Sequence, residues 1–481
     1  MAKCIMIQGT MSSAGKSYIV TGLCRYYARR GLRVAPFKSQ NMALNSYITE
    51  DGLEMGRAQV VQAFACGKKP SVYMNPVLLK PTTDVGSQVI VEGKSIGNMK
   101  AADYFKYKTK LIPNILHAYE TLAKDNDLIV IEGAGSPAEI NLKENDIVNM
   151  GLAKILDTPV VLVGDIDPGG VFAQLDGTID LLTEEEKNRI KGFIINKFRG
   201  DVELLRPGLD MIEEKTGKSV IGVVPMSKAK IEEEDSITSA FTNIKKEGTV
   251  IDVAVIRLPR ISNFTDFNAL QIVPGVNVRY INKPSELCDP DMIIIPGTKS
   301  TIADLNWLKE TGLFDMIKGL SKERPVMGIC GGYQMMGLEI DDPYRIEGGG
   351  KAEGLGLIPM KTVLEKEKTT KQVSGKFENI KGDFSFLNNR CYEGYEIHNG
   401  SSVMMEDKTT ENVFGTYIHG IFDRKEITES VLNFLIKNRG LDLMPEAMDI
   451  EDYRNSQYDI IADELEKAID FEKLDRIIGL C

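Results

Sequence analysis

The sequence contains few residues of the kinds that build metal clusters or stabilise secreted folds. Its 481 residues include three histidines, one tryptophan and seven cysteines. The cysteines are odd in number and scattered, and no CxxC pair occurs among them. This pattern supports neither a disulfide framework nor a zinc knuckle. A reducing cytoplasm is therefore the expected location.

Long apolar runs and an excess of basic charge are also missing. No stretch approaches the roughly 20 apolar residues that a membrane-spanning helix needs, and the N-terminus shows no secretory leader pattern. The formal net charge is −11, and a field of this sign disfavours general binding to nucleic acid or to a membrane surface. We expect a protein that binds neither.

What the sequence does contain is short apolar runs that alternate with longer helical patterns. Continuous Val/Ile runs separated by helices are typical of parallel strands buried on both faces. A first series of such runs lies at 4–9, 33–39, 128–135, 159–167, 192–198 and 219–224. A second series lies at 250–259, 276–281, 291–300 and 325–330, with shorter, more mixed strands up to 422. The predicted fold class is α/β, with two three-layer domains.

Charged and polar residues from 231 to about 249 separate the two series. Because the chain is too long for one compact core, we expect two domains. The expected boundaries are an ATP-binding domain at 1–235, a linker at 236–249, a second domain at 250–435 and a helical tail at 436–481.

A phosphate-binding loop is predicted in the first domain, where "IQGTMSSAGKS" follows a strand and opens a helix. Loop N–H groups and a helix N-terminus cradle phosphate oxygens in such a context. Lys16 is expected to neutralise the phosphates of ATP, and Ser17 to bind Mg²⁺. Five residues separate Gly9 from Gly15, and Thr10 takes the place of the usual first glycine. The alternative, a strand–helix turn with a chance GKS, explains less of this context.

Other residues of this predicted site follow apolar strands, where the sheet topology places ligands. Glu132 is the best carboxylate for Mg²⁺, and Glu54 is a second candidate that could equally be an ordinary helix-start glutamate. Lys38 could reach the transferring phosphoryl group or simply extend into solvent. Asn196 is a candidate for contact with adenine, although a cap or turn role fits it nearly as well.

The second domain contains a cysteine between glycines, in "GICGG". A G-x-C-x-G turn between a strand and a helix matches a nucleophile elbow, which presents Cys330 at the helix N-terminus. The N–H of Gly331 would then face a developing oxyanion, and Gly297 in "IIIPGTKST" could supply the other donor. The alternative is a small buried cysteine that glycines happen to flank.

A cysteine nucleophile needs a base, and the three histidines are the candidates. His117 lies in a helical pattern of the first domain and is expected to be a packed helix residue. His398 and His419 both follow Cys330 in the chain. We favour His419, which ends a strand-like run at a glycine turn, whereas His398 fits a structural or substrate-pocket role equally well.

Ordered stretches of the whole chain resemble one family, the cobyric acid synthases. The P-loop spacing is similar to that of dethiobiotin synthetase-type ATPases. The other stretches include "PFKSQNMALNSYIT", "EMGRAQVVQA", "IEGAGSPAEINL", "GDIDPGGVFA", "PGTKST", "GICGGYQMMG", "GYEIHNG" and "GTYIHGIFD". The resemblance implies a synthetase-type P-loop domain followed by a class I glutamine amidotransferase domain. It identifies Cys330 as the amidase nucleophile and His419 as its histidine.

The same resemblance implies the reaction, which is the ATP-dependent amidation of the b, d, e and g carboxylates of adenosylcobyrinic acid a,c-diamide. L-glutamine supplies the nitrogen, and ATP with Mg²⁺ activates each carboxylate. Asp146 is a weak candidate for ordering the corrinoid, with a helix N-terminal aspartate as the alternative. Two positions depart from the expected pattern. Ile421 stands where most amidotransferases have the glutamate that orients the histidine, and Pro168 stands where an arginine is expected.

Two other functions remain open from the sequence. The sibling cobyrinic acid a,c-diamide synthases share this architecture but amidate the a and c carboxylates. A P-loop nucleotide switch of the partition type is the nonenzymatic alternative. Met11 speaks against it, because those ATPases carry a lysine at that position.

Overall fold

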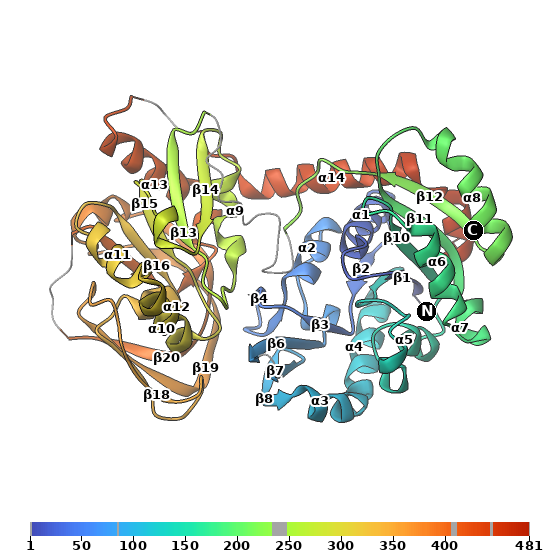
Figure 1. Ribbon diagram of the computed structural model, residues 1–481, viewed down its shortest axis with the longest axis horizontal. Helices are drawn as coiled ribbons and strands as arrows, with labels where there is room; N and C mark the ends of the chain where they lie inside the picture. The colour runs from blue at the N-terminus through green and yellow to red at the C-terminus, as the bar shows by residue number, and fades with distance from the viewer. Residues whose placement is uncertain (1, 84–85, 233–247, 406–410, 443–445, 481) are drawn as a thin grey trace. The chain divides into compact units, whose positions relative to one another are not determined.

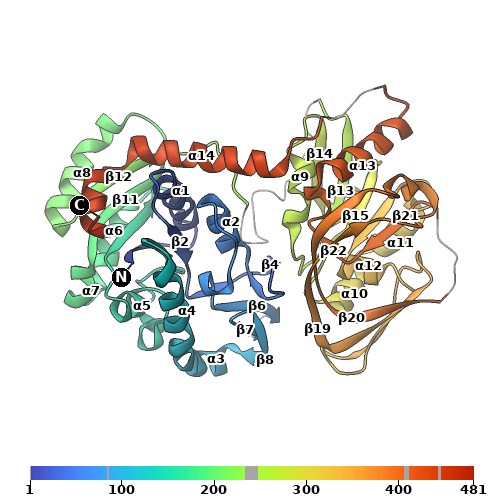
Figure 2. The same ribbon diagram turned by 180° about the vertical axis from the view of Figure 1, so that it is seen from behind.

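A computed structural model describes residues 2–83, 86–232, 248–405, 411–442 and 446–480 (Figures 1 and 2). The chain forms two compact units. Unit 1 comprises Met1–Ala43, Met55–Glu232 and Arg454–Cys481, and unit 2 comprises Leu44–Glu54 and Glu233–Tyr453. Of the linker expected at 236–249, all but the last two positions lie outside the described residues.

Unit 1 is built on a six-stranded sheet in the order β12-β11-β10-β1-β9-β2 (Figure 1). All of its neighbouring strands are parallel. The strands are β1 (Lys3–Gly9), β2 (Val34–Phe37), β9 (Leu128–Glu132), β10 (Val160–Asp165), β11 (Ile190–Phe198) and β12 (Ser219–Pro225). They coincide with the first predicted series, and their buried Val/Ile runs explain why they lie inside the sheet.

Helices cover both faces of this sheet. On one face, α1 packs over Ile5 and Ile7. On the other, α6 covers Gly164, where an added Cβ would lie 2.7 Å from Val171. The helices of unit 1 are α1 (Lys16–Arg29), α2 (Arg57–Ala65), α3 (Ala101–Tyr107), α4 (Ile112–Asp125), α5 (Met150–Ile155), α6 (Val171–Asp180), α7 (Glu184–Arg189), α8 (Val202–Thr216), α14 (Ile450–Ala468) and α15 (Phe471–Ile478).

The C-terminal helices belong to the core of unit 1 from Arg454 onward, which differs from the separate tail expected at 436–481. Helix α14 packs so closely on α1 that a Cβ at Gly22 would lie 2.4 Å from Leu465 (Figure 2). The physical reason is apolar burial, because Leu465 and Leu474 are completely buried in the same cluster as α1.

A smaller sheet has the strand order β3-β6-β7-β8. Its first strand, β3, follows β2 in the sequence. Its strands are β3 (Gln40–Met42), β6 (Val77–Thr83), β7 (Gly86–Val91) and β8 (Lys94–Lys100), and two short strands, β4 (Ser46–Ile48) and β5 (Glu54–Gly56), pair with each other. Residues 44–54, which contain β4 and the first residue of β5, belong to unit 2. We call residues 44–54 the crossing segment.

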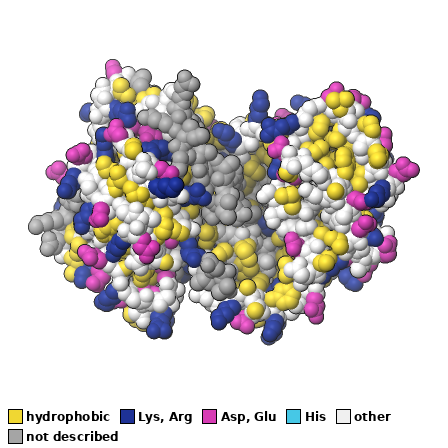
Figure 3. All heavy atoms as spheres, viewed as in Figure 1, with side chains coloured by type: hydrophobic (Ala, Val, Ile, Leu, Met, Phe, Trp, Pro, Cys, Tyr) yellow, Lys and Arg dark blue, Asp and Glu magenta, His cyan; other side chains and the backbone are white. Residues whose placement is uncertain are grey.

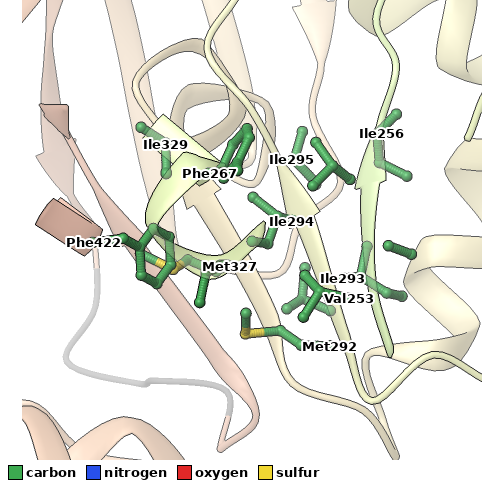
Figure 4. Packing of buried hydrophobic residues seen from close by; sticks show 14 of the residues in the cluster. Val253, Ile256, Phe267, Met292, Ile293, Ile294, Ile295, Met327, Ile329 and Phe422 are labelled. Atoms are coloured by element: carbon green, nitrogen blue, oxygen red, sulfur yellow. The ribbon is translucent and has the colours of Figure 1, made fainter. Parts of the chain in front are cut away.

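Unit 2 contains a parallel five-stranded sheet in the order β14-β13-β15-β16-β21. Its strands are β13 (Ile251–Ile256), β14 (Val276–Ile281), β15 (Met292–Ile295), β16 (Val326–Ile329) and β21 (Val413–Thr416). Figure 4 shows the apolar side chains of β13, β15 and β16 packed with Phe267 and Phe422. The helices are α9 (Asn268–Gln271), α10 (Thr301–Thr311), α11 (Leu313–Leu320), α12 (Gly331–Met335) and α13 (Lys425–Asn438). These parallel sheets confirm the predicted α/β class.

A second sheet of unit 2 is mixed, in the order β18-β17-β19-β20-β22. Its strands are β17 (Glu339–Asp342), β18 (Gly350–Glu353), β19 (Met360–Lys376), β20 (Cys391–Met404) and β22 (Ile418–His419). The long antiparallel pair of β19 and β20 brings Tyr395 opposite His419, because β22 pairs with β20 at that point. This sheet therefore positions the predicted catalytic histidine.

Candidate active sites

The phosphate-binding loop lies between β1 and α1, as the motif predicts. Gly15 precedes the helix in a left-handed conformation, with φ of 97°, which glycine adopts at little cost. The ammonium group of Lys16 donates to the carbonyls of Met11 at 2.9 Å, Ser12 at 3.0 Å and Gly135 at 3.0 Å. The lysine is therefore folded over the loop, where phosphate oxygens bind in a P-loop.

The carboxylate of Glu132 is the centre of this site. Its Oε1 accepts from the Ser17 hydroxyl at 2.9 Å and from Lys38 Nζ at 3.0 Å. Burial raises the pKa of Glu132, but the charge and hydrogen bond of Lys38, together with Gln62 and Lys16, outweigh burial. The pKa of Glu132 is therefore lowered overall. The structure thus brings together the three residues that the sequence placed at separate strand and helix ends.

Gln62 joins these residues and was missed from the sequence. Its Nε2 donates to Glu132 Oε2. Because an ionised carboxylate only accepts hydrogen bonds, this contact fixes which way the Gln62 amide faces. The amide oxygen, Oε1, is then buried without a hydrogen-bond partner among the described residues. A glutamine inside a helix has no sequence signal that marks it for such a role.

The oxygen atoms gathered here fit a magnesium ion. No group of three or more His, Cys, Asp or Glu side chains that could hold a metal occurs in the described part of the chain. Mg²⁺ does not need such a cage, because it binds through few carboxylates, several waters and substrate phosphates. The Ser17 hydroxyl, the Glu132 carboxylate and the unpartnered Gln62 Oε1 supply oxygen groups of the required kind.

The remaining predicted nucleotide residues support the loop. Asn196 Nδ2 donates to the carbonyl of Ala14 at 3.0 Å. A Cβ at Gly15 would lie 1.9 Å from that Nδ2, so the close approach requires glycine. The Thr10 hydroxyl donates to Gln174 Oε1 at 2.9 Å.

Two weaker candidates lie in settings that favour other roles. Glu54 is buried in unit 2, where its carboxylate pairs with Lys368 Nζ at 2.6 Å. Asp146 accepts from the backbone N–H groups of Val148 at 2.8 Å and of Gly151, also at 2.8 Å. Asp146 thus lies before α5, whose N-cap residue is Asn149, and its carboxylate accepts from backbone N–H groups at the start of that helix.

In unit 2, Cys330 lies at the turn between β16 and α12. Its backbone has φ of 52° and ψ of −110°, a conformation that costs energy for a residue with a side chain. A Cβ at Gly332 would lie 2.0 Å from the carbonyl oxygen of Ile295, so the turn depends on that glycine. Cys330 is 6% exposed, and its thiol lies 3.4 Å from the carbonyl oxygen of Ile397. This strained, glycine-dependent turn is the geometry of a nucleophile elbow.

His419 is held by Asp266, which answers what replaces the missing glutamate at position 421. Asp266 Oδ2 lies 2.7 Å from His419 Nδ1, and Asp266 Oδ1 accepts from the N–H of Gly420 at 3.0 Å. Both side chains are buried, with exposures of 1% and 3%. The sequence did not reveal Asp266, because it lies 153 residues before His419 and only the fold brings them together.

The pKa of His419 reflects these neighbours. Burial lowers it, but the charge and hydrogen bond of Asp266 outweigh burial, and Cys330 adds to the effect. The pKa of His419 is raised to about 10 as a result. The imidazole beside Cys330 is therefore positively charged at neutral pH.

The two glycines predicted for the oxyanion hole, Gly297 and Gly331, both lie beside the turn that carries Cys330. A Cβ at Gly297 would lie 3.0 Å from Cε1 of His419. A Cβ at Gly331 would lie 2.8 Å from Cγ2 of Thr298, the residue that follows Gly297. The β15 turn therefore packs directly against the cysteine turn and against the histidine.

The other histidines have different environments. His398 stacks on the ring of Tyr417, with centroids 3.8 Å apart, and its Nδ1 lies 3.1 Å from the carbonyl oxygen of Gly400. His117 is largely exposed on α4, where it pairs with Glu92 at 3.3 Å. Neither of these two histidines has the environment of His419, which is buried with the carboxylate of Asp266 and lies beside Cys330.

The surface and the helices add two general observations. On the face in view in Figure 3, basic and acidic side chains are interspersed over the described residues. Among the helices of the described ranges, none combines the length and the apolar character needed to span a membrane.

Comparison with known families matches both units. Residues 5–238 match the CobQ/CobB/MinD/ParA nucleotide binding domain, and residues 252–427 match the CobB/CobQ-like glutamine amidotransferase domain. The chain is 55% identical over 511 residues to the cobyric acid synthase of Lachnoclostridium phytofermentans, an alignment that covers 99% of each chain. It is 52% identical over 501 residues to that of Ruminiclostridium cellulolyticum, covering 99% of this chain and 97% of the other. It is 50% identical over 503 residues to that of Caldanaerobacter subterraneus, covering 99% of each. The chain therefore belongs to the cobyric acid synthase family.

Proposed function

We propose that this protein catalyses the ATP-dependent, glutamine-hydrolysing amidation of the b, d, e and g carboxylates of adenosylcobyrinic acid a,c-diamide. The observation that carries the proposal is the presence of two chemically complementary sites on one chain. Unit 2 has a nucleophile elbow with a charged histidine, and unit 1 has a P-loop whose lysine and serine adjoin a buried carboxylate. The name that the relatives share, cobyric acid synthase, supports a corrinoid as the substrate.

The amidotransferase residues have defined roles in this reaction. The Cys330 thiolate attacks the side-chain carboxamide carbon of glutamine, and backbone N–H groups of Gly297 and Gly331 stabilise the oxyanion. His419, held by Asp266, donates its proton to the leaving nitrogen, so ammonia departs and a thioester remains. His419 then accepts a proton from water, which hydrolyses the thioester to glutamate and restores Cys330.

The residues of unit 1 prepare the acceptor. Bound Mg·ATP supplies the phosphoryl group that converts a substrate carboxylate into an acyl phosphate, a species that ammonia can attack with release of phosphate. Lys16 and Lys38 neutralise charge on the phosphoryl oxygens. Ser17 and Glu132 would hold the metal, and Asn196 and Thr10 keep the loop in shape for ATP. Glu54 and Asp146 are left as weaker candidates for metal and corrinoid contacts.

The experiment that tests this proposal is mass spectrometry of the corrinoid product. Purified protein is incubated with the a,c-diamide, ATP, Mg²⁺ and glutamine, and in parallel with cobyrinic acid as the acceptor. We expect amides at the b, d, e and g positions of the a,c-diamide. Amidation of cobyrinic acid at a and c alone would identify the sibling activity, and no amide with either acceptor would refute an amidoligase.

A variant separates the two half-reactions. Cys330→Ala removes the nucleophile, so we expect no amidation with glutamine. With ammonium chloride as the nitrogen source, the same variant is expected to amidate at the wild-type rate. Loss of both activities in a folded variant would contradict the division of labour between the units.

A further inference from the structure

The crossing segment, residues 44–54, is held by the mixed sheet that carries the catalytic histidine. The Thr370 hydroxyl donates to the carbonyl of Gly52 at 2.8 Å, and Gln372 Nε2 donates to the carbonyl of Ile48. Both side chains project from β19, where Thr370 is paired with Ile397 and Gln372 with Tyr395 on β20. The crossing segment therefore lies over these cross-strand pairs.

One contact of the crossing segment leads to His419. The Tyr395 hydroxyl donates to the carbonyl of Ser46 at 3.1 Å. The Tyr395 ring stacks on the imidazole of His419, with centroids 5.4 Å apart and an interplanar angle of 22°. Because Tyr395 is 4% exposed, its ring has little room to move independently of either neighbour.

A second contact leads to Asp266. The N–H of Ser46 donates to Asn263 Oδ1 at 3.1 Å, and Asn263 Nδ2 lies 3.4 Å from the Tyr395 hydroxyl. Asn263 has φ of 52° and ψ of 37° and begins the short helix η4 (Phe264–Phe267). The N–H of Asp266 donates back to the Asn263 carbonyl at 3.0 Å. The crossing segment is thus bonded to the residue that starts the turn bearing Asp266.

A third contact leads to Cys330. Ile48 of the crossing segment is completely buried in a cluster with Tyr395 and Ile397. The carbonyl oxygen of Ile397 is the group that lies 3.4 Å from the Cys330 thiol. Each of the three catalytic residues of unit 2 therefore has a direct neighbour that packs on or bonds to the crossing segment.

We propose that Tyr395 is a positioning residue for His419 and that the crossing segment, acting through Tyr395, Asn263 and Ile397, makes glutamine hydrolysis depend on the state of the phosphate site. The covalent chain supplies the link. The crossing segment begins shortly after Lys38 and ends shortly before α2, the helix that carries Gln62. Lys38 and Gln62 both contact Glu132, so filling that site acts on both ends of the crossing segment. This inference rests on the proposed function.

The coupling is tested by measuring glutamate release from glutamine with and without ATP, Mg²⁺ and the a,c-diamide. In the wild type we expect these ligands to stimulate glutamate release by at least about tenfold, the equivalent of one or two hydrogen bonds. The double variant Thr370→Val and Gln372→Leu frees the middle and end of the crossing segment. We expect stimulation in this variant to fall to about twofold or less, with ammonia-dependent amidation unchanged. Ser374→Ala, at an exposed position of the same strand, is the matched control and is expected to behave as wild type.

Tyr395→Phe gives an independent test, because it keeps the stacked ring and removes only the bond to Ser46. We expect kcat for glutamine hydrolysis in the presence of the ligands to fall about two- to tenfold, with KM for glutamine unchanged. Tyr395→Leu, which also removes the ring, is expected to lose more. Equal stimulation of glutamate release in the wild type and the double variant would overturn the proposal. The same holds if the ligands do not change glutamate release by the wild type. Failure of the proposed function would give a different result, namely the absence of amide product. Failure of the coupling alone would leave the amide product and give glutamate release that does not change when the ligands are added.

Discussion

Replacement of Asp266 by asparagine tests the arrangement of the amidotransferase site most directly. Asparagine keeps the shape of the side chain but presents an amide to His419 Nδ1 in place of a carboxylate. In the wild type, the carboxylate lies 2.7 Å from Nδ1 and also accepts from Gly420 N–H at 3.0 Å. The substitution therefore removes the charge that keeps His419 protonated and favours the wrong tautomer of the ring.

The magnitude follows from burial. Both partners are almost completely shielded from water, and removal of one partner of a buried pair costs roughly 3–5 kcal/mol. If this cost raises the activation free energy of glutamine hydrolysis, kcat falls by roughly a hundredfold to several thousandfold. Amidation with ammonium chloride does not use His419, so it is expected to remain within about twofold of the wild type, by comparison with surface substitutions.

The assay compares glutamate release with ammonia-dependent amidation on the same preparation. A second readout is the pH dependence of Cys330 alkylation by iodoacetamide, which reports the thiolate. We expect alkylation of the variant to require higher pH, because the imidazole no longer carries a positive charge at neutral pH. A loss of glutamine hydrolysis below about tenfold, with the alkylation profile unchanged, would refute the role assigned to Asp266.

Three further outcomes are expected. Lys16→Ala is expected to abolish amidation with either nitrogen source, while glutamate release persists at the rate seen without ATP, Mg²⁺ and the a,c-diamide. Amide formation with ammonia at the wild-type rate would contradict the P-loop assignment. Gln62→Leu is expected to weaken the Mg²⁺-dependent part of nucleotide binding by about 10- to 100-fold, measured by titration with a fluorescent ATP analogue in Mg²⁺ and in EDTA. Gln59→Leu, one turn earlier on α2, is the control, and equal affinities for both variants would count against Gln62. The raised pKa of His419 means that the unfolded chain loses a proton above about pH 6.5 that the folded chain keeps to about pH 10. The stabilisation from the pair of His419 and Asp266 is therefore full below about pH 6.5 and is lost as the pH rises to about 10. The urea concentration at the midpoint of unfolding is expected to fall across this interval. A steeper fall in His419→Gln than in the wild type would contradict the assignment.

Much of the fold follows from local sequence patterns. The parallel strands are continuous apolar runs, and the runs alone predicted their positions because both faces are buried. The P-loop and the cysteine turn were also predictable, since each needs particular residues at fixed spacing. Glu132 and Lys38 could be placed because each ends a buried strand, where parallel topology collects side chains at one edge.

Other features depend on long-range contacts that leave no local pattern. The strand β19 reads as "MKTVLEKEKTTKQVSGK", a charged sequence without apolar alternation over much of its length. It becomes a strand because β20 supplies backbone partners along it. Asp266 is likewise one aspartate in the short helix η4, and only the fold brings it to His419. The Gln62 amide acquires its role only from the carboxylate it meets.

The return of the C-terminus to unit 1 bears on how the chain is made. Domains near the N-terminus usually fold while the rest of the chain is still being synthesised. Here α1 packs against Ile461 and Leu465, and Arg454 joins Arg57 in pairing with the buried Glu232. The nucleotide-binding core therefore cannot close until helices α14 and α15 have been synthesised and can pack against α1. A fragment that stops at Glu232 lacks Ile461 and Leu465, so it leaves the apolar face of α1 that they cover exposed.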